Sequence, residues 1–259
     1  PSHAPATLPT GPRLFDAAAS DPKAVAVADQ VMAAVGGEAA WAKAKEIRWH
    51  HAIFLDGKTT IDVEHAWDRW NGRHQFVKKQ GDSSAKAMYE LYSDVATAFI
   101  VREEQQEEAA TSEDREGLVA EARQRWAEDS YELLMPFKLK EPGVHLAWVE
   151  ERPLPGAKEP GLDVIKVTFD PGVGLSPGNV YYVVVDKTTH LVDTVELIQA
   201  GKSDNQRIGY KWSDWVDVGG LRFATTRQNL GYQGEQIKMD NIRVSDSPDD
   251  DLYVPAVKF

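Results

Sequence analysis

The chain of 259 residues contains no cysteine, which excludes disulfides, thiolate catalysis and zinc sites with cysteine ligands. Basic residues are few, since 29 Lys and Arg stand against 41 Asp and Glu, and the net charge is -12. Lys and Arg form only short pairs such as Lys78-Lys79, so nucleic acid is disfavoured as a partner and the acidity favours solubility. Long apolar runs are also lacking. The longest, such as residues 180–185, have strand length, and we predict no transmembrane segment.

The composition is that of a folded protein. Hydrophobic residues make up 42% of the chain, and a chain of this length buries roughly three quarters of its unfolded surface. We expect a flexible, Pro-rich tether over residues 1–13 and one domain over residues 14–259, with a helical insertion at about 103–140. Because the chain starts at Pro1 rather than Met, we expect an exported bacterial protein, periplasmic or outer-membrane-associated, with its signal segment and any lipid anchor upstream of Pro1. A cytoplasmic location is the alternative.

The N-terminal part of the domain has the spacing of helices. Apolar residues recur at helical intervals over residues 22–35, with Asp21 as N-cap and Gly36-Gly37 as the stop, and a second short helix is expected at 38–45. In the charged middle, helical intervals separate Leu118, Val119, Ala122 and Trp126.

Two segments flank this pattern. The acidic run over residues 103–108 is expected to be a solvated helix start or loop. Residues 131–137 are expected to form a separate short helix, ended by Pro136 and packed across the sheet.

Residues 47–79 predict a β-meander with one apolar face. A three-residue loop at 56–58 would place Ile53 opposite Ile61, His51 opposite Val63 and Trp49 opposite His65, because alternate residues share a face. The dipeptide Asn71-Gly72 predicts a two-residue turn, which would place Trp67 opposite Phe76.

More strands follow. Residues 86–92 and 94–101 predict weaker strands, and after Gly143 the pattern predicts strands at 144–151, 162–170, 179–186, 191–199, 206–215, 221–230 and 235–244. The short loops between them exclude parallel pairing, so we predict a mainly β (α+β) fold with a large antiparallel meander that curls into an open or closed barrel.

The sequence shows no motif that specifies a reaction. His51 and His65 share a face, but a metal site would need a third ligand that the sequence does not show, so we predict no metal, no cofactor and no catalytic residue. Asp62, Glu64 and Asp68 form a carboxylate row on the opposite face and are expected to be solvated. The glycine-rich residues 172–178 lack the following helix and lysine of a phosphate site and are expected to form a turn.

The organisation resembles the LolA/LolB-like lipoprotein-sorting superfamily. The resemblance rests on the helix before Gly36-Gly37, the Trp49 strand, the helical interruption after Val101 and the late run of strands. Residues 129–144 are similar to a segment of an uncharacterised bacterial envelope branch, and residues 215–223 resemble its late hairpin with a Gly-Leu pair. The resemblance implies an open half-barrel covered by a few helices, with a hydrophobic cavity that binds acyl chains.

We therefore expect a non-catalytic periplasmic or envelope protein that binds a lipid or a lipoprotein acyl chain in the concave face of its sheet. The predicted ligand-binding residues are Trp49, His51, Val63, His65, Trp67, Phe76, Leu133, Leu134 and Met135. One alternative is a structural or interaction module, with a fully packed sheet and an envelope protein as partner. A second alternative is a hydrolase using His51 or His65, which requires a carboxylate on the same face.

Overall fold

The computed structural model describes residues 14–102, 106–109, 111–156, 158–173 and 177–254, so the expected tether over residues 1–13 lies outside the described residues. The chain divides into two compact units. Of the described residues, the first unit contains Ala42–Ser130 and 237–254, and the second contains 14–41 and Tyr131–Gln236. The expectation of one domain over residues 14–259 stays a prediction.

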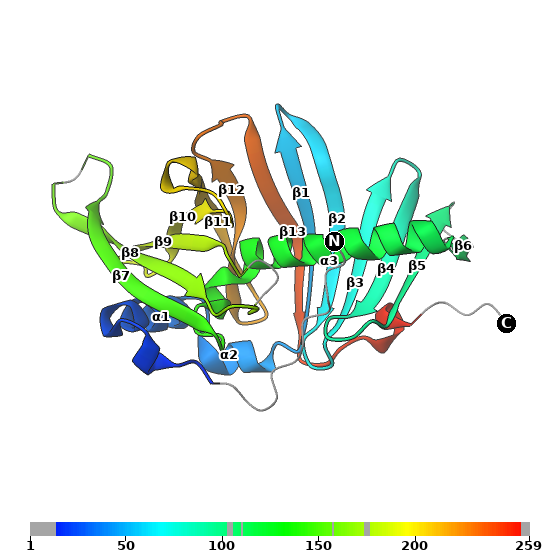
Figure 1. Ribbon diagram of the computed structural model, residues 1–259, viewed down its shortest axis with the longest axis horizontal. Coiled ribbons are helices and arrows are strands. Elements are labelled where there is room, and N and C mark those ends of the chain that lie inside the picture. The colour runs from blue at the N-terminus through cyan, green and yellow to red at the C-terminus, as the bar shows by residue number, and fades with distance from the viewer. Residues whose placement is uncertain (1–13, 103–105, 110, 157, 174–176, 255–259) are drawn as a thin grey trace. The chain divides into compact units, whose positions relative to one another are not determined.

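The first unit is an antiparallel sheet with the strand order β6-β5-β4-β3-β2-β1-β13 (Figure 1). Its strands are β1 (Glu46–Leu55), β2 (Lys58–Asp68), β3 (Arg73–Gln80), β4 (Ser83–Glu90), β5 (Ala96–Arg102), β6 (Gln106–Ala109) and most of β13 (Glu235–Ser245). The prediction for residues 103–108 is wrong from residue 106 onward, because the backbone of β6 pairs with that of β5; residues 103–105 lie outside the described residues.

The first hairpin has the predicted register but a different loop. Trp49 lies opposite His65 and His51 opposite Val63, as predicted. The loop is the two residues Asp56 and Gly57, and a bulge after Ile53 restores the pairing. Both loop residues have positive φ, 50° and 75°, as a type I′ turn requires.

The second hairpin corrects the prediction, since Trp67 lies opposite His74 and not opposite Phe76. A carboxylate explains the longer turn over residues 69–72. Asp68 accepts hydrogen bonds from the backbone N–H groups of Trp70 at 3.0 Å and Asn71 at 2.9 Å, and from the Arg73 side chain at 2.7 Å. Asp68 is buried by these partners, so it is not part of a solvated carboxylate row.

The second unit is also an antiparallel sheet, with the order β12-β11-β10-β9-β8-β7. Its strands are β7 (Val144–Pro153), β8 (Pro160–Phe169), β9 (Val180–Asp186), β10 (Val192–Ile198), β11 (Ile208–Val218) and β12 (Leu221–Asn229), and they confirm the predicted run. Helix α1 (Pro22–Ala34) begins at the predicted N-cap, where the Asp21 carboxylate accepts from the Lys23 N–H at 2.7 Å. Helix α2 (Gly37–Lys43) follows. The predicted mainly β fold, an antiparallel meander with a few helices, is confirmed.

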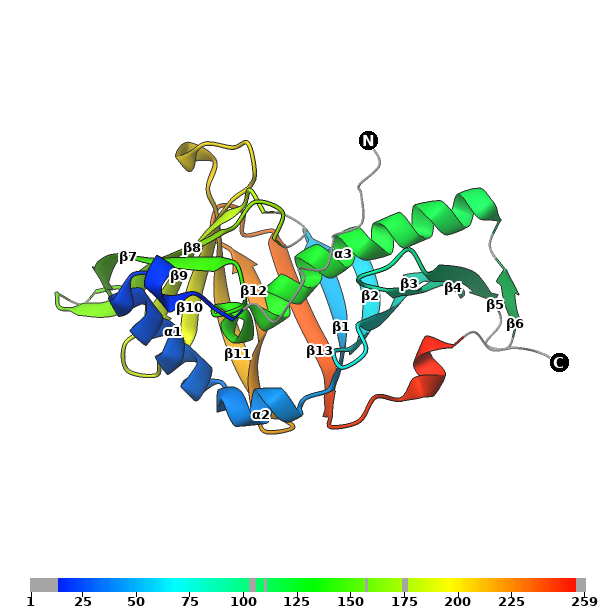
Figure 2. The same cartoon turned by 60° about the horizontal axis from the view of Figure 1, so that its bottom comes forward.

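Helix α3 (Ser112–Lys138) is one continuous helix, and the prediction that residues 131–137 form a separate helix is wrong (Figure 2). Pro136 lies inside it and has no N–H for the carbonyl oxygen of Glu132, four residues earlier. Arg227 of β12 replaces that donor through Nε at 3.2 Å and Nη2 at 2.5 Å. The helix therefore continues through the proline. Despite its length, neither α3 nor any other helix among the described residues is apolar enough to cross a membrane.

Candidate functional site

The first unit has one sheet face that α3 covers, which we call the inner face. The 112–130 part of α3 crosses the strands of this unit in both views (Figures 1 and 2). Strand alternation and register place the following buried residues on the inner face: Trp49, His51, Val63, His65, Trp67, His74, Phe76, Ala85, Ala87, Tyr89 and Ala98. Six of the nine residues predicted to bind a ligand are among them.

The inner face is filled by side chains. Trp49, His51, Val63, His65, Trp67 and Phe76 are all between 0% and 7% exposed. The ring of Trp49 stacks on His65 with centroids 4.5 Å apart, and Trp67 meets Trp126 of α3 edge-on at 4.7 Å. The structure thus brings together these predicted residues, but as packing partners of each other and of α3.

The other three predicted residues lie in the second unit. Leu133, Leu134 and Met135 belong to the last turns of α3 and are 0% to 2% exposed. Their role in closing a ligand site over the residues of the first unit stays a prediction.

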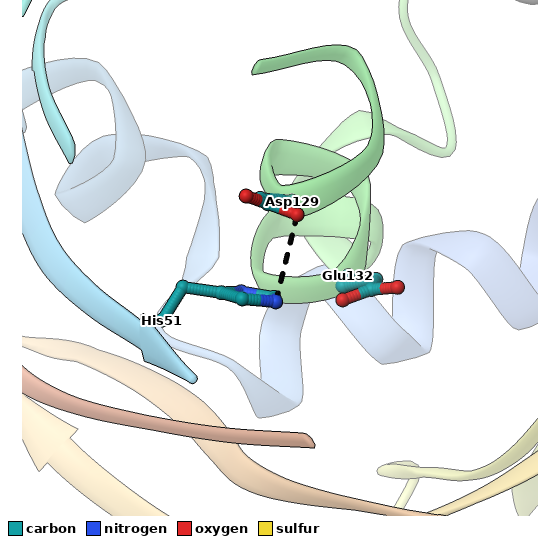
Figure 3. Close-up of side chains that lie close together, drawn as sticks. All are labelled: His51, Asp129 and Glu132. Carbon is teal, nitrogen blue, oxygen red and sulfur yellow. Dashed lines mark ion pairs between the residues drawn. The ribbon is translucent and has the colours of Figure 1, made fainter. Parts of the chain in front are cut away.

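A polar cluster lies in the middle of the aromatic inner face. It comprises His51, His65 and His74 from the sheet with Arg125 and Asp129 from α3, and we call it the histidine cluster. His65 Nε2 lies 2.9 Å from Asp129 Oδ2, and its Nδ1 lies 3.2 Å from His74 Nε2. His51 Nε2 lies 3.5 Å from the other oxygen of Asp129, and Figure 3 shows the two side chains facing each other. Glu132 lies one turn further along α3.

The contacts define a direction for the protons. An ionised Asp129 accepts from His65 Nε2–H, and His65 Nδ1 then accepts from His74 Nε2–H. His74 Nδ1 is buried and accepts or donates no hydrogen bond within the part of the chain that the structure describes. In this arrangement it is an unprotonated ring nitrogen and leaves no buried N–H unsatisfied.

Arg125 compensates the charge of Asp129. Its Nε donates to Asp129 Oδ2 at 3.0 Å and its Nη2 donates to Oδ1, so the pair is bidentate. Burial raises the pKa of Asp129, whereas the bidentate contact with Arg125 opposes that effect and favours the ionised carboxylate. Burial, together with the Arg125 charge, lowers the pKa of His65 to about 3, and burial likewise lowers the pKa of His74 well below its ordinary value. The imidazoles of His65 and His74 are therefore neutral at neutral pH.

Asp129 is the third group that a metal site with His51 and His65 would need, but the arrangement does not suit a metal ion. Two imidazoles and a carboxylate match the ligands that zinc prefers. Arg125, however, donates to both oxygens of Asp129, which leaves that carboxylate less available to a divalent ion.

Sequence reasoning missed Asp129, although a signal was present. Ala122, Trp126 and Asp129 follow one another at spacings of four and three, which places all three on one helix face. The two apolar residues identify that face as the buried one. A carboxylate on it was therefore a candidate for a buried contact with the strand histidines.

A groove of about 340 Å³ lies beside the first residues of β2 and the last residues of β3. Its lining residues are Thr59, Thr60, Ile61, Asp62, Val63, Lys78, Lys79 and Gly81. Val63 belongs to both the groove and the buried part of the inner face. The groove therefore shares one residue, Val63, with the set predicted to bind a ligand.

Comparison with protein-family models finds no match. No curated protein matches the chain in sequence. Solved structures with a similar arrangement include a DUF1329 family protein from Desulfovibrio piger, 11% identical with a TM-score of 0.49, where the match covers 91% of this chain and 98% of that chain. They also include a LolA superfamily protein from Nitrosomonas europaea, 9% identical with a TM-score of 0.44, over 85% of this chain and 98% of that chain. This second structure belongs to the superfamily that the sequence resembles.

Proposed function

We propose that this is a non-catalytic protein of the bacterial envelope that binds a lipid or the acyl chain of a lipoprotein on the inner face of its first unit. The 112–130 part of α3 is the lid of this site. The ligand enters when the lid separates from the sheet, and its chain then covers the aromatic residues that the lid covers in the structure. The observation that carries the proposal is the presence of a buried ion pair and three histidines between the lid and an otherwise apolar face.

Energetics favour separation at this surface. Two apolar residues of the lid, Ala122 and Trp126, are buried against the sheet, whereas Arg125 and Asp129 contribute an ion pair. Apolar residues in place of a buried ion pair are often neutral or stabilising by about 1–4 kcal/mol. The lid is thus attached less firmly than an all-apolar helix would be, and its polar residues gain water when it opens.

The exposed face would then favour a hydrophobic ligand. Trp49, Trp67 and Phe76 present large apolar surfaces, which are unfavourable in water. Each methylene of a chain that covers them contributes about 0.8 kcal/mol. A long acyl chain therefore supplies enough free energy to replace the lid without any specific polar contact.

The burial of the inner face also favours a second candidate, a structural or interaction module whose sheet stays packed. The hydrolase alternative finds its carboxylate in Asp129, but His51, His65 and Asp129 are between 0% and 2% exposed, so no substrate reaches them in this state. The envelope location stays part of the proposal.

Native mass spectrometry tests the proposal. The protein is isolated gently from a bacterial envelope fraction, and its mass is measured before and after organic extraction. A removable adduct with the mass of a lipid supports the ligand-binding function. A mass that equals the bare chain, together with no binding of added fluorescent fatty acid, contradicts it and supports the packed module.

A further inference from the structure

The groove beside β2 and β3 combines two apolar residues, Ile61 and Val63, with the cation of Lys78. Val63 and Lys78 are direct neighbours in the β2–β3 register, and both line the groove. Lys78 alternates with Phe76 and His74 along β3, so its side chain is on the inner face. An acyl chain that lies on Val63 and Phe76 would thus end beside an ammonium group.

Lys78 forms an ion pair with a residue of the lid, and this ion pair breaks when the lid separates from the sheet. Lys78 Nζ lies 2.7 Å from Glu121 Oε1 on α3, and the two side chains are 31% and 35% exposed. An ion pair that is this accessible contributes about 0–1 kcal/mol. Another anion that reaches the groove can therefore replace Glu121 at little cost.

The neighbouring lysine is different and provides a control. Lys79 Nζ lies 3.2 Å from Glu64 and 3.9 Å from Asp62, both of which alternate with Val63 onto the outer face of β2. The ammonium group of Lys79 thus lies beside carboxylates of the outer face, although part of the residue lines the groove.

We infer that the groove binds the anionic head of a single-chain amphiphile, a carboxylate or a phosphate, with Lys78 as its cation. The inference rests on the proposed function and names the class of ligand. The head replaces Glu121 at Lys78, so the lysine keeps a counter-charge while the lid loses one contact with the sheet. A groove of about 340 Å³ is at the low end of ligand sites, which span about 300–1,000 Å³. It takes the head and the first carbons, and the rest of the chain lies under the lid.

The test compares heads on one chain length. Palmitate, palmitoyl lysophosphatidic acid and the neutral 1-monopalmitin are titrated below their micellar concentrations against the full chain and three variants. The variants are Lys78→Met, Glu121→Gln and, as matched control, Lys79→Met. We expect Lys78→Met to weaken binding of the anionic amphiphiles at least tenfold and to leave 1-monopalmitin unchanged. Glu121→Gln removes the competing carboxylate and should increase the affinity for the anionic amphiphiles several-fold. Lys79→Met should leave the affinity for all three amphiphiles unchanged.

The outcomes separate the two proposals. Equal binding of charged and neutral amphiphiles to all variants overturns the role of Lys78 and leaves the proposed function intact. No binding of any of them to the unmodified chain overturns both. A loss of palmitate binding without loss of the phosphate, or the reverse, identifies the head. Circular dichroism of each variant confirms that it is folded, and the opposite effect of Glu121→Gln distinguishes a lost cation from a damaged fold.

Discussion

Arg227 donates two hydrogen bonds to the carbonyl oxygen of Glu132, the acceptor that Pro136 leaves without a donor inside α3. The guanidinium is 1% exposed and stacks on Trp212, with its carbon 3.3 Å from the ring centroid. Burial lowers the pKa of Arg227 to about 9, with the nearby Glu132 opposing. The buried Arg227 thus donates the hydrogen bonds that the Glu132 carbonyl oxygen lacks within the helix.

This relationship predicts a coupling between residues 136 and 227. Arg227→Met should lower the free energy of unfolding by about 2–4 kcal/mol, because it leaves a buried carbonyl unsatisfied and removes the stacking on Trp212. In a Pro136→Ala background the new N–H donates to Glu132, so the same substitution should cost at least about 1 kcal/mol less. Urea unfolding of the four proteins measures the coupling. Equal costs in both backgrounds would show that Arg227 does not act through this carbonyl.

The ion pair of the histidine cluster predicts a second non-additive effect. Asp129→Asn leaves the partly buried Arg125 with the exposed Glu128 as its only remaining ion-pair partner among the described residues, and should lower the free energy of unfolding by about 1–3 kcal/mol. The double variant Arg125→Met with Asp129→Leu should recover most of that loss, because it removes both charges. Under the proposed function, the same double variant should bind a fluorescent fatty acid more slowly than the unmodified chain. A double variant that is less stable than Asp129→Asn contradicts the account of the lid.

The neutral histidines predict a loss of stability in acid. In the unfolded chain each imidazole takes up a proton near pH 6.5, whereas the folded-state pKa of His65 is about 3 and that of His74 is also far below 6.5. The folded state then binds fewer protons, so His65 lowers the free energy of unfolding by about 1.4 kcal/mol per pH unit from pH 6.5 to 4, and His74 acts in the same direction. Asp129 has the opposite effect, because burial raises its pKa, and the proton that it takes up in acid stabilises the folded state relative to the unfolded chain.

The substitution His74→Phe isolates one of these contributions. The difference in free energy of unfolding between the unmodified chain and the variant should change by at most about 1.4 kcal/mol per pH unit below pH 6.5, in favour of the variant in acid. Urea unfolding at three pH values measures that difference, in which the groups common to both proteins cancel. A difference that is constant with pH would mean that His74 takes up its proton equally well in both states.

The turn between β2 and β3 predicts unequal effects for two aspartates of one strand. Asp68→Ala removes the acceptor for two backbone N–H groups and for Arg73, and should destabilise the protein by about 2–3 kcal/mol. Asp62→Ala on the outer face should change stability by no more than about 0.5 kcal/mol. Similar thermal denaturation of the two variants would contradict the role of Asp68 in this turn.

Local patterns predicted much of the sheet from the sequence. Alternation of Trp49, His51 and Ile53 against Ile61, Val63 and His65 was enough for the register of the first hairpin, because a one-residue shift would expose every one of them. The second hairpin could not be predicted in this way. Its turn depends on the hydrogen bonds of the Asp68 carboxylate. The Asn71-Gly72 dipeptide predicts a shorter turn and gives no sign of these contacts.

The centre of the candidate site depended on contacts between distant residues. His65 and Asp129 are 64 positions apart, and no local pattern relates a strand histidine to a helix carboxylate so far along the chain. The continuous helix was missed for the same reason, since Pro136 ends a helix unless a donor such as Arg227, 91 positions later, replaces its N–H. Strand alternation identified the inner face, whereas the lid and its polar contacts required the fold.

A cleavable cross-link between the lid and the sheet tests the central claim most directly. Arg123 of α3 donates to the backbone oxygen of Ser93 in the β4–β5 turn at 2.8 Å, and the chain contains no cysteine. Arg123→Cys with Ser93→Cys can therefore be joined selectively by a bifunctional thiol reagent with a reducible spacer, with the two single variants as controls. The account predicts that the cross-linked protein loses binding of a fluorescent fatty acid and regains it on reduction. Equal binding before and after reduction would contradict the claim that a ligand reaches the inner face by displacing α3.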